Sequence, residues 1–453
     1  MEKPDPQALA ALHPVADAVL SRLPGSVKIY CVGGAVRDHL LGLPKADRDF
    51  VVVGATIQAM INAGFTPVGK DFPVFLHPVS HDEYALARTE RKSGKGYKGF
   101  TFNADPAVTL EEDLSRRDLT VNAMAVDASG QLIDPFHGWQ DLQDQCFRHV
   151  GPAFLEDPVR LLRLSRFAAK WPRFTIAAET QALCRQIVAA GEADALIAER
   201  VWQEISKGLM ERQPSRMLDV LSDAGAWTAI TKTPDTHPAT RQALDQSAAE
   251  AAPIEVRFAL LVNDRPPALL RCFKAPRQLT EIAGLLAASL EQLPVLIAVL
   301  NTILTSASAD LADAVDVAGA SGVAGAADAA GVADVADVAD VAGASGVTVL
   351  LHWLERTDAW RRPERLKYLL FAHHLRQDLT PAAITTLSLM AAHLSSPAAH
   401  ARITARVEAA QSADAVIGDA VQDEKRALIR DFMNTFISAP VSAPVSDFMK
   451  RPL

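Results

Sequence analysis

The sequence predicts an α+β protein, with a head of strands and helices to about residue 150 and an all-α remainder. Between residues 27 and 150, short strand-like and helix-like segments alternate with Gly and Pro punctuation. After Gly151-Pro152, Leu, Ala and Arg recur at helical spacing and strand-like segments disappear. A chain of 453 residues is long enough for two to four domains.

The head is organised around residues 27–53. An apolar run from Val27 to Val32 predicts a strand, and Gly33-Gly34 predicts a tight turn whose backbone can approach a ligand closely. Ala35 to Leu41 predicts a short helix that ends at Gly42. The backbone N–H groups of the turn form a candidate anion site, and Arg37 lies one turn into the helix, within reach of a phosphate.

The next strand carries a pair of carboxylates. Asp47-Arg48-Asp49 leads directly into Phe50 to Val53, and residues i and i+2 of a strand face the same side, about 7 Å apart. Two neighbouring carboxylates repel each other unless a cation lies between them, and such oxygen ligands suit Mg²⁺ shared with substrate phosphates. Alone, a GG turn or an Asp-x-Asp is common in loops. Their combination in one short stretch is far more specific.

Further along the head, Phe72 to Leu76 and Glu83 to Thr89 predict strands. Residues 83–100 interleave basic and aromatic side chains, which is typical either of phosphate or single-strand contacts or of a solvated loop. Residues 116–123, RRDLTVNA, predict a helix that carries Arg117 and Asn122, although these arginines could simply pair with Glu111 and its acidic neighbours on a helix surface.

A third motif opens the all-α part. Asp157-Pro158 predicts a helix start, with Asp157 at the N-cap and Pro158 at N1. The helix then carries a stripe of cations with no acidic residue before Ala178, while leucines and Phe167 fall on the neighbouring face. The stripe consists of Arg160, Arg163, Arg166 and Lys170.

The remaining chain is helical apart from one unusual segment. Residues 305–347 are rich in Ala, Val and Asp, repeat Val-Ala-Asp with a period of three, and fall within a stretch without Lys or Arg from 278 to 355. We expect a solvated insertion that does not contact RNA, with Ala-rich helix in places as the alternative. We divide the chain into 1–26 (a helical extension), 27–150, 151–215, 216–304, 305–347 and 348–453.

Composition limits the possible classes. The net charge is −9, from 45 basic and 54 acidic residues, so a nucleic-acid partner would need a local basic face. The four cysteines form no CxxC pair, which argues against a zinc site or a disulfide framework. We find neither a signal peptide nor an apolar run of membrane-spanning length, and expect a soluble, cytoplasmic protein without membrane contact.

Taken together, the three motifs resemble those of the polymerase-β-like nucleotidyltransferases. The segment GGAVRDHLLGLPKADRDFVVVG, the sequence RRD-x-x-x-NA at 116–123 and ED-x-x-R-x-x-R at 156–163 resemble the bacterial class II tRNA nucleotidyltransferases, the CCA-adding enzymes. The resemblance is dense over residues 27–215, weak over 216–347 and faint again at 358–370. It implies a head with a mixed sheet (27–150), a neck (151–215), a body (216–304) and a tail (348–453).

The resemblance also implies roles for residues. Asp47 and Asp49 would be catalytic and bind two Mg²⁺ ions, with Glu83, Glu90 or Asp118 as an undecided third carboxylate. Asp157 and Arg160 would hydrogen-bond the edge of the incoming base in place of a nucleic-acid template, and residues 94–102 would lie in or beside a loop that helps to switch nucleotide choice. The residues implied to contact nucleotide, with Asn122 shaping the pocket, are Gly34, Arg37, Arg117, Asp157, Arg160, Arg163 and Arg166.

The implied reaction is the addition of C, C and A to the tRNA 3′ end from CTP and ATP. The helical part would hold the acceptor arm and T-loop of the tRNA; the oligomeric state is left open. A bacterial poly(A) polymerase shares all three motifs, and a non-catalytic RNA-binding relative is a further alternative that the intact aspartate pair disfavours. Some relatives carry a phosphohydrolase site of the HD type, but the corresponding pair here is Asn263-Asp264, so we expect no such activity.

Overall fold

The computed structural model describes residues 4–14, 17–44, 47–68, 74–92, 100–263, 266–313, 344–357, 361–412 and 416–438. It divides into two compact units. The first comprises residues 1–235 with 272–274, and the second comprises 236–271 with 275–453. Most of residues 305–347, the loop at 93–99 and Asp264 lie outside the described residues. The finer division expected from the sequence remains a prediction.

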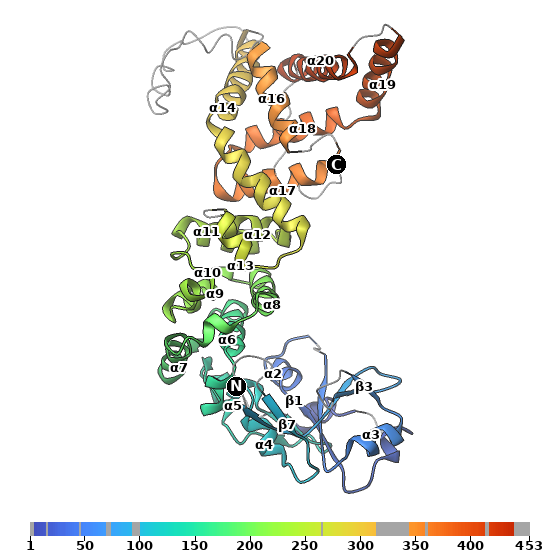
Figure 1. Ribbon diagram of the computed structural model, residues 1–453, viewed down its shortest axis with the longest axis vertical. Helices are drawn as coiled ribbons and strands as arrows, with labels where there is room; N and C mark the ends of the chain where they lie inside the picture. Colours follow the sequence, from blue (N-terminus) through green and yellow to red (C-terminus); the bar gives the residue numbers. More distant parts are fainter. Residues whose placement is uncertain are drawn as a thin grey trace. The chain divides into compact units, whose positions relative to one another are not determined.

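A mixed sheet forms the centre of the first unit, as the sequence and the resemblance predicted (Figure 1). Strand β1 pairs with β2 in antiparallel register, from Lys28↔Val53 to Val32↔Asp49, and β2 pairs with β5 in parallel. In spatial order the strands are β3 (Thr66–Val68), β4 (Val74–Leu76), β5 (Glu83–Leu86), β2 (Asp49–Val53), β1 (Lys28–Val32), β8 (Ala125–Val126) and β9 (Leu132–Ile133). A separate ribbon joins β6 (Thr89–Lys92) to β7 (Phe100–Asn103).

Short helices connect these strands. Thr56 caps α3 by accepting from the Ala59 amide, and Thr109 and Glu112 form a capping box that starts α4. Leu114 of α4 is fully buried with Val32, Val51 and other apolar residues of the sheet. The helical segments of the head are α1 (Pro6–Ala10), η1 (Leu20–Arg22), α2 (Gly34–Leu40), α3 (Ile57–Ala63), α4 (Leu110–Ser115), η2 (Thr120–Asn122) and α5 (Gly138–Gln143).

The predicted helix over residues 116–123 is wrong in extent. Helix α4 ends at Ser115, and only a 3-10 turn, η2, follows. Between them the chain runs alongside residues 148–150: Leu119 bridges His149, and the Thr120 amide donates to the Arg148 carbonyl. These tertiary hydrogen bonds replace the helical ones, a preference that local sequence does not reveal. The predicted helical extension at 1–26 is likewise reduced to α1 and η1.

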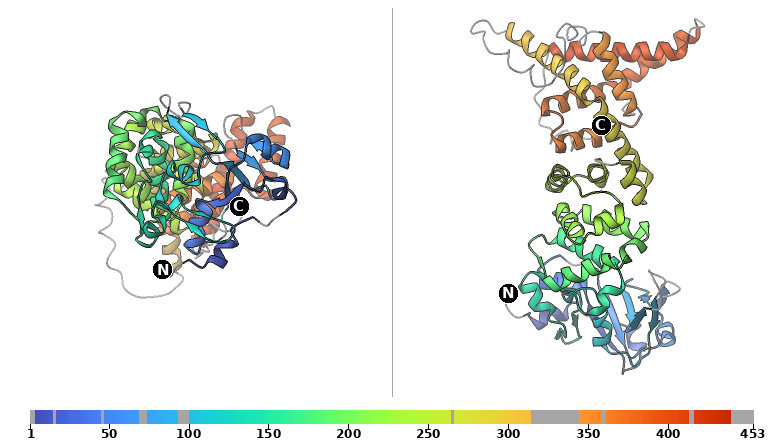
Figure 2. Two further views of the ribbon diagram at one scale, coloured as in Figure 1. Left: turned by 90° about the horizontal axis from the view of Figure 1, so that it is seen from below. Right: turned by 60° about the vertical axis from the view of Figure 1, so that its left-hand side comes forward.

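Helices continue the first unit beyond the head, and the green helices stand against the blue and cyan head in Figures 1 and 2. Helix α6 packs against α8 and α9 with its leucine face buried. One short strand pair persists here, β10 (Cys146–Phe147) with β11 (Thr175–Ile176), so strands do not end at residue 152. The helices are η3 (Pro152–Glu156), α6 (Val159–Lys170), α7 (Ala178–Ala189), η4 (Glu192–Ala195), α8 (Ala198–Leu209), α9 (Pro214–Asp223) and α10 (Ala226–Thr231).

The second unit is helical throughout its described part. Its long helix α14 (Arg277–Asp313) packs against α12, α16, α17, α18 and α20. Residues 305–313 extend α14 and residues 344–347 start α16, so the two ends of the low-complexity segment are helical, as the Ala-rich alternative allowed. The other helices are α11 (Pro238–Ala249), α12 (Ile254–Val262), α13 (Pro266–Cys272), α16 (Ala344–Arg356), α17 (Pro363–Arg376), α18 (Pro381–Leu394), α19 (Pro397–Ser412) and α20 (Ile417–Ser438).

Helix α14 also corrects the expectation that no apolar run reaches membrane-spanning length. Within its 26-residue portion Arg277–Thr302, a window of 18 residues has a mean hydropathy of 1.9, and 33% of that window is buried. The core helix of a soluble protein passes the same test of length and composition. Glu281 and Glu291 lie within the segment, and five helices pack along α14, so we interpret it as the core helix of the second unit.

Candidate active site

An open cleft of about 680 Å³ lies in the first unit, between the head and helices α6 and α8. Four carboxylates line it, from Asp49, Asp118, Asp157 and Glu204. They are outnumbered by eight cations, from Arg37, Arg116, Arg117, Arg160, Arg163, Arg166, Arg200 and Lys170. This excess of positive charge in a protein of net charge −9 fits an anionic ligand such as a triphosphate. All the residues predicted to contact nucleotide line the cleft, together with Asp49 and Asp118, whereas Asp47 and Glu83 do not line it.

The Gly33-Gly34 turn forms one wall of the cleft. Gly33 has φ = +67°, a conformation that favours glycine, and its amide donates to the Met124 carbonyl over 3.1 Å. A Cβ at this position would lie 2.7 Å from Nη1 of Arg117. The backbone conformation therefore favours glycine at this position, and a side chain here would also displace the Arg117 guanidinium.

Asp49 opens strand β2 beside a second acid. Its Cα partner in the parallel strand β5 is Glu83, so the two residues lie directly across from each other. Desolvation in the cleft, followed by the negative charges of Glu83 and Asp47, raises the pKa of Asp49, while Arg117 opposes the shift. Such mutual repulsion is what a bound cation relieves, and this donor set suits a divalent metal ion.

Asp47 lies two residues before the strand, which begins at Asp49, so the two aspartates do not share a regular strand as predicted. The Arg48 between them pairs with Asp82 over 2.8 Å. Within the described residues, no three His, Cys, Asp or Glu side chains are grouped closely enough to form a metal site of protein ligands alone. A metal here would take part of its coordination from substrate phosphates, as Mg²⁺ commonly does.

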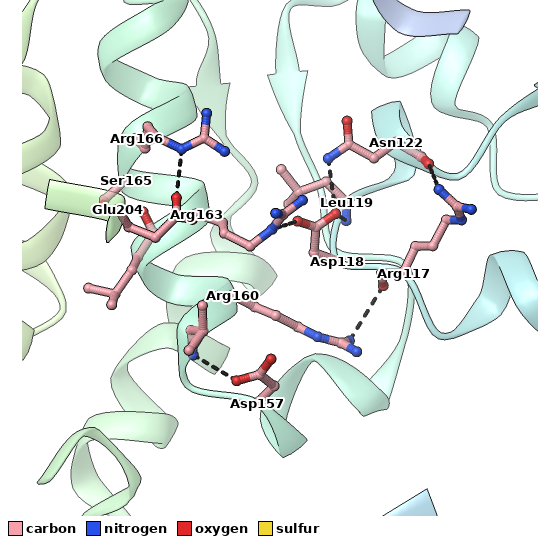
Figure 3. Close-up of polar contacts among 12 residues, drawn as sticks. Arg117, Asp118, Leu119, Asn122, Asp157, Arg160, Arg163, Ser165, Arg166 and Glu204 are labelled. Atoms are coloured by element: carbon pink, nitrogen blue, oxygen red, sulfur yellow. Dashed lines mark hydrogen bonds and ion pairs between the residues drawn. The ribbon is translucent and has the colours of Figure 1, made fainter. Parts of the chain in front are cut away.

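The RRD-x-x-x-N motif forms a network rather than a row of free ligands (Figure 3). Asp118 accepts from Asn122 Nδ2 over 2.9 Å and from Arg163 Nε over 2.7 Å. Burial alone would raise the pKa of Asp118, but Arg163, Asn122 and the Leu119 amide hold it well below its usual range. Arg117 contacts Asp113, and its buried Nε has no hydrogen-bond partner among the described residues.

The N-terminal end of α6 differs from the prediction by one residue. Pro158 occupies the N-cap position, and Asp157 precedes it while its Oδ1 still accepts from the Val159 amide over 3.0 Å. Arg160 is buried, and its Nη2 donates to the Arg116 carbonyl over 2.6 Å. Both residues line the cleft, and the second carboxylate oxygen of Asp157 accepts no hydrogen bond from the part of the chain that the structure describes.

Arg163 and Arg166 are each held by a carboxylate that accepts a hydrogen bond from Nε, as Figure 3 shows. Asp118 holds Nε of Arg163, and Glu204 of helix α8 holds Nε of Arg166 over 2.6 Å. Among the described residues, no hydrogen bond uses the Nη atoms of either arginine, so both guanidinium groups keep these donors for a phosphate. Sequence reasoning missed Glu204, which is 38 residues from Arg166 and belongs to no motif that we had identified.

Arg37 is more enclosed than a free phosphate ligand would be. Its side chain is 7% exposed, its Nε donates to Asp38 Oδ1 over 2.7 Å, and its Nη1 donates to Asn122 Oδ1. Of the three candidates for a third carboxylate, Asp118 is bound to Arg163, Glu83 faces Asp49, and the side chain of Glu90 lies outside the described residues.

Comparisons with known proteins identify the family of this chain. Residues 29–148 match the family model described as the poly A polymerase head domain. The CCA-adding enzyme of Bordetella pertussis is 56% identical over 269 residues, which cover 59% of this chain and 74% of that protein. The multifunctional CCA protein of Dechloromonas aromatica is 58% identical over 254 residues, or 52% of this chain and 62% of the relative, so the match spans less than two thirds of that protein.

Solved structures show the same fold. The CCA-adding enzyme of Bacillus stearothermophilus in complex with CTP aligns with a TM-score of 0.60 and 21% identity, over 96% of this chain and 94% of that one. A tRNA-processing enzyme (apo form I) aligns with a TM-score of 0.56 and 21% identity, over 96% and 99%. Fold and cleft thus define a protein with a nucleotidyltransferase head of the poly(A) polymerase type. Within that class, the chain belongs to the family of CCA-adding enzymes, which confirms the resemblance found in the sequence.

Proposed function

We propose that this protein is a CCA tRNA nucleotidyltransferase, which adds C, C and A to the tRNA 3′ end from CTP and ATP without a nucleic-acid template. The main support is the convergence of all three motifs in one cationic cleft. In this reaction the 3′-hydroxyl oxygen of the tRNA attacks the α-phosphorus of the nucleotide. The hydroxyl proton is lost, the bond from the α-phosphorus to the bridging oxygen breaks, and pyrophosphate leaves.

Each part of the cleft has a task in this reaction. Asp47 and Asp49, together with substrate phosphates, would hold a divalent metal ion, which we propose is Mg²⁺; when bound, it lowers the pKa of the 3′-hydroxyl and neutralises the triphosphate. Arg163 and Arg166 would bind the phosphates through their Nη groups. Together with Arg117 and the Gly34 turn, these arginines orient the reacting phosphorus and stabilise charge on the pyrophosphate.

Base choice is the task of Asp157 and Arg160 in this proposal. The free carboxylate oxygen of Asp157 is an acceptor for the amino group that both cytosine and adenine carry. A guanidinium group donates to the ring nitrogens of either base. Uracil and guanine present a carbonyl where cytosine and adenine present the amino group, so neither matches a carboxylate acceptor there.

We propose Glu83 as the third carboxylate that assists the aspartate pair, because the sheet places it across from Asp49. Because it faces Asp49, Glu83→Gln is expected to reduce kcat by about 10- to 100-fold and to raise the metal concentration needed for half-maximal activity. Titrating Mg²⁺ against the rate of CTP addition measures both effects. Glu111→Gln, a neutralisation on the exposed face of α4, serves as the matched control. An unchanged metal requirement in Glu83→Gln would remove Glu83 from the metal site.

One assay separates this function from its alternatives. tRNA lacking CCA is incubated with Mg²⁺ and each nucleotide alone or combined, and the 3′ ends are sequenced. A CCA-adding enzyme adds C from CTP alone and completes CCA only when ATP is also present. A poly(A) polymerase would instead extend the end with ATP alone, and a non-catalytic relative would leave it unchanged.

The helical remainder of the chain would hold the tRNA acceptor arm and T-loop by shape and backbone contacts. We propose that the protein works in the cytoplasm.

We also propose that the chain lacks phosphohydrolase activity, although some relatives are named multifunctional. Asn263 stands where a metal-binding histidine would be expected, and it is buried with its Oδ1 unpartnered. An amide cannot replace imidazole as a ligand for a transition metal. Incubation with 2′-AMP and with 2′,3′-cyclic AMP in Ni²⁺ or Mn²⁺ is expected to release no phosphate and open no ring. Turnover that Asp264→Ala abolishes would contradict this proposal.

A further inference from the structure

Helix α6 is attached to the head at three places along its length. Near its N-terminal end, Arg160 donates to the backbone carbonyl of Arg116 over 2.6 Å. One turn further, Arg163 pairs with Asp118 over 2.7 Å. Both attachments use residues already assigned to nucleotide binding. The third lies at the C-terminal end of α6, around Trp171, and has no role in the mechanism so far.

The third attachment centres on the Arg37 guanidinium. Its Cζ lies 4.7 Å from the ring centroid of Trp171 and 5.2 Å from that of Phe167, both within cation–π distance. The same guanidinium donates to Asp38 Oδ1 and Asn122 Oδ1. Although it borders the cleft, Arg37 directs these hydrogen bonds at protein groups, and its side chain is almost fully enclosed. This arrangement suits a connecting residue better than a phosphate ligand.

Lys170 of helix α6 contacts the same group of residues. Its Nζ lies 3.6 Å from Asp38 Oδ2 and 4.5 Å from the ring centroid of Trp171. Asp38 therefore receives one cation from α2 on one carboxylate oxygen and one from α6 on the other. Because its side chain is only 10% exposed, these pairs are screened less than surface pairs. We call Arg37, Asp38, Lys170 and Trp171 the α2–α6 clamp.

Buried neighbours support the clamp on both sides. Trp171 stacks on Phe167 with 5.6 Å between ring centroids, and both rings approach the fully buried Phe147 at 6.3 Å. On the other side, α2 follows directly from β1, whose five residues all pair with β2. A continuous path of packed elements thus links the Asp49 strand, through β1 and α2, to the far end of the helix that starts after Asp157.

We propose that Asp38 and Trp171 are positioning residues for nucleotide transfer, which hold α6 against α2 and so keep the base-binding end of α6 in register with the carboxylates of β2. This inference rests on the proposed function. In this proposal Arg37 acts mainly through the clamp, while its phosphate contact stays a prediction. A misplacement of about 1 Å between bound groups is enough to slow a reaction by about 100-fold.

Substitution of Trp171 tests the clamp. In Trp171→Leu, kcat for CTP and for ATP is expected to fall at least about tenfold, while KM stays within about twofold, because phosphate and base contacts remain but alignment is lost. Misincorporation of UTP relative to CTP is expected to rise. Trp171→Phe keeps an aromatic face over Arg37 and is expected to recover most of the kcat. Steady-state rates, 3′-end sequencing and thermal unfolding measure these effects in the full-length protein.

A matched control separates positioning from general stability. Trp227 of α10 lies in the same unit and is 2% exposed, but it does not line the cleft. Trp227→Leu is expected to lower Tm and to leave kcat and base selectivity unchanged at temperatures well below Tm. If Trp171→Leu does not fold, Asp38→Asn removes the charge that holds Arg37 and Lys170 at nearly constant volume, with the same expected loss of kcat.

Three results would overturn the proposal. An unchanged kcat in folded Trp171→Leu or Asp38→Asn would leave the clamp a purely structural feature. A raised KM with unchanged kcat would return Arg37 to the role of a phosphate ligand. If the wild-type protein fails to extend tRNA with CTP and ATP, the proposed function itself is wrong and the clamp proposal with it, whereas an active wild type with an insensitive clamp contradicts only the clamp.

Discussion

Asp49→Asn is expected to abolish nucleotide addition and at the same time to increase thermal stability slightly at neutral pH. The loss of activity follows because an amide is a poor ligand for a divalent cation and cannot balance its charge. We expect less than a tenth of wild-type activity, and the same for Asp47→Asn. A single-turnover assay with CTP and tRNA lacking CCA measures the rate, and filter binding measures tRNA affinity, which is expected to remain.

The gain in stability follows from the raised pKa of Asp49. A carboxyl whose pKa is higher in the folded than in the unfolded state opposes folding when it is charged, so at pH 7 its removal stabilises the metal-free protein. As pH falls through the raised pKa, wild-type Asp49 becomes protonated and the difference in Tm between wild type and Asp49→Asn is expected to shrink. Thermal unfolding in EDTA at several pH values tests this.

Two outcomes would contradict the assignment. Activity above a tenth of wild type in both variants would remove the aspartates from the metal site. A lower Tm for Asp49→Asn at neutral pH would show that its charge stabilises the fold and is not repelled by Glu83 and Asp47. Saturating Mg²⁺ provides the control, because bound cation should stabilise the wild type more than the variant.

The sequence was sufficient to predict the mixed head, the helical remainder and a nucleotide cleft built from three motifs. Local patterns dominate there: apolar runs beside Gly33-Gly34 and Asp49 coincide with strands β1 and β2, and cations at helical spacing coincide with α6. The fold class and the family are confirmed by the structure and the comparisons. The roles of individual residues remain predictions.

What the sequence could not predict depends on partners distant in the chain. Residues 116–119 leave the helical conformation because residues 148–150 offer hydrogen bonds that no local pattern announces. The stripe on α6 seemed to lack acidic partners, but Asp118, Glu204 and Asp38 supply them from three other segments. Trp171 belongs to none of the sequence motifs, and only the folded structure shows that its ring packs against the Arg37 guanidinium.

Asp157→Asn is expected to change base choice while leaving the fold intact. Oδ1 of the asparagine can still accept from the Val159 amide, so the start of α6 is preserved. The free acceptor oxygen becomes an NH₂ donor, which no longer matches the amino group of cytosine or adenine but does match the carbonyl of uracil or guanine. A base-edge contact carries about 1–3 kcal/mol of discrimination, equivalent to a shift of about 5- to 150-fold in the ratio of CTP to UTP incorporation.

Asp157→Ala and Arg163→Ala complete the comparison. Asp157→Ala loses the base contact and the hydrogen bond from the Val159 amide together, so it is expected to relax base choice and also to lower the stability of the folded state by ~1 kcal/mol. Arg163→Ala removes a phosphate contact, which is blind to the base, and is expected to raise KM for CTP and ATP alike. Competition assays with all four nucleotides, read by 3′-end sequencing, separate the two classes. If Asp157→Asn keeps wild-type selectivity, or Arg163→Ala changes the preference between bases, the proposed division between base-reading and phosphate-binding residues on α6 is wrong.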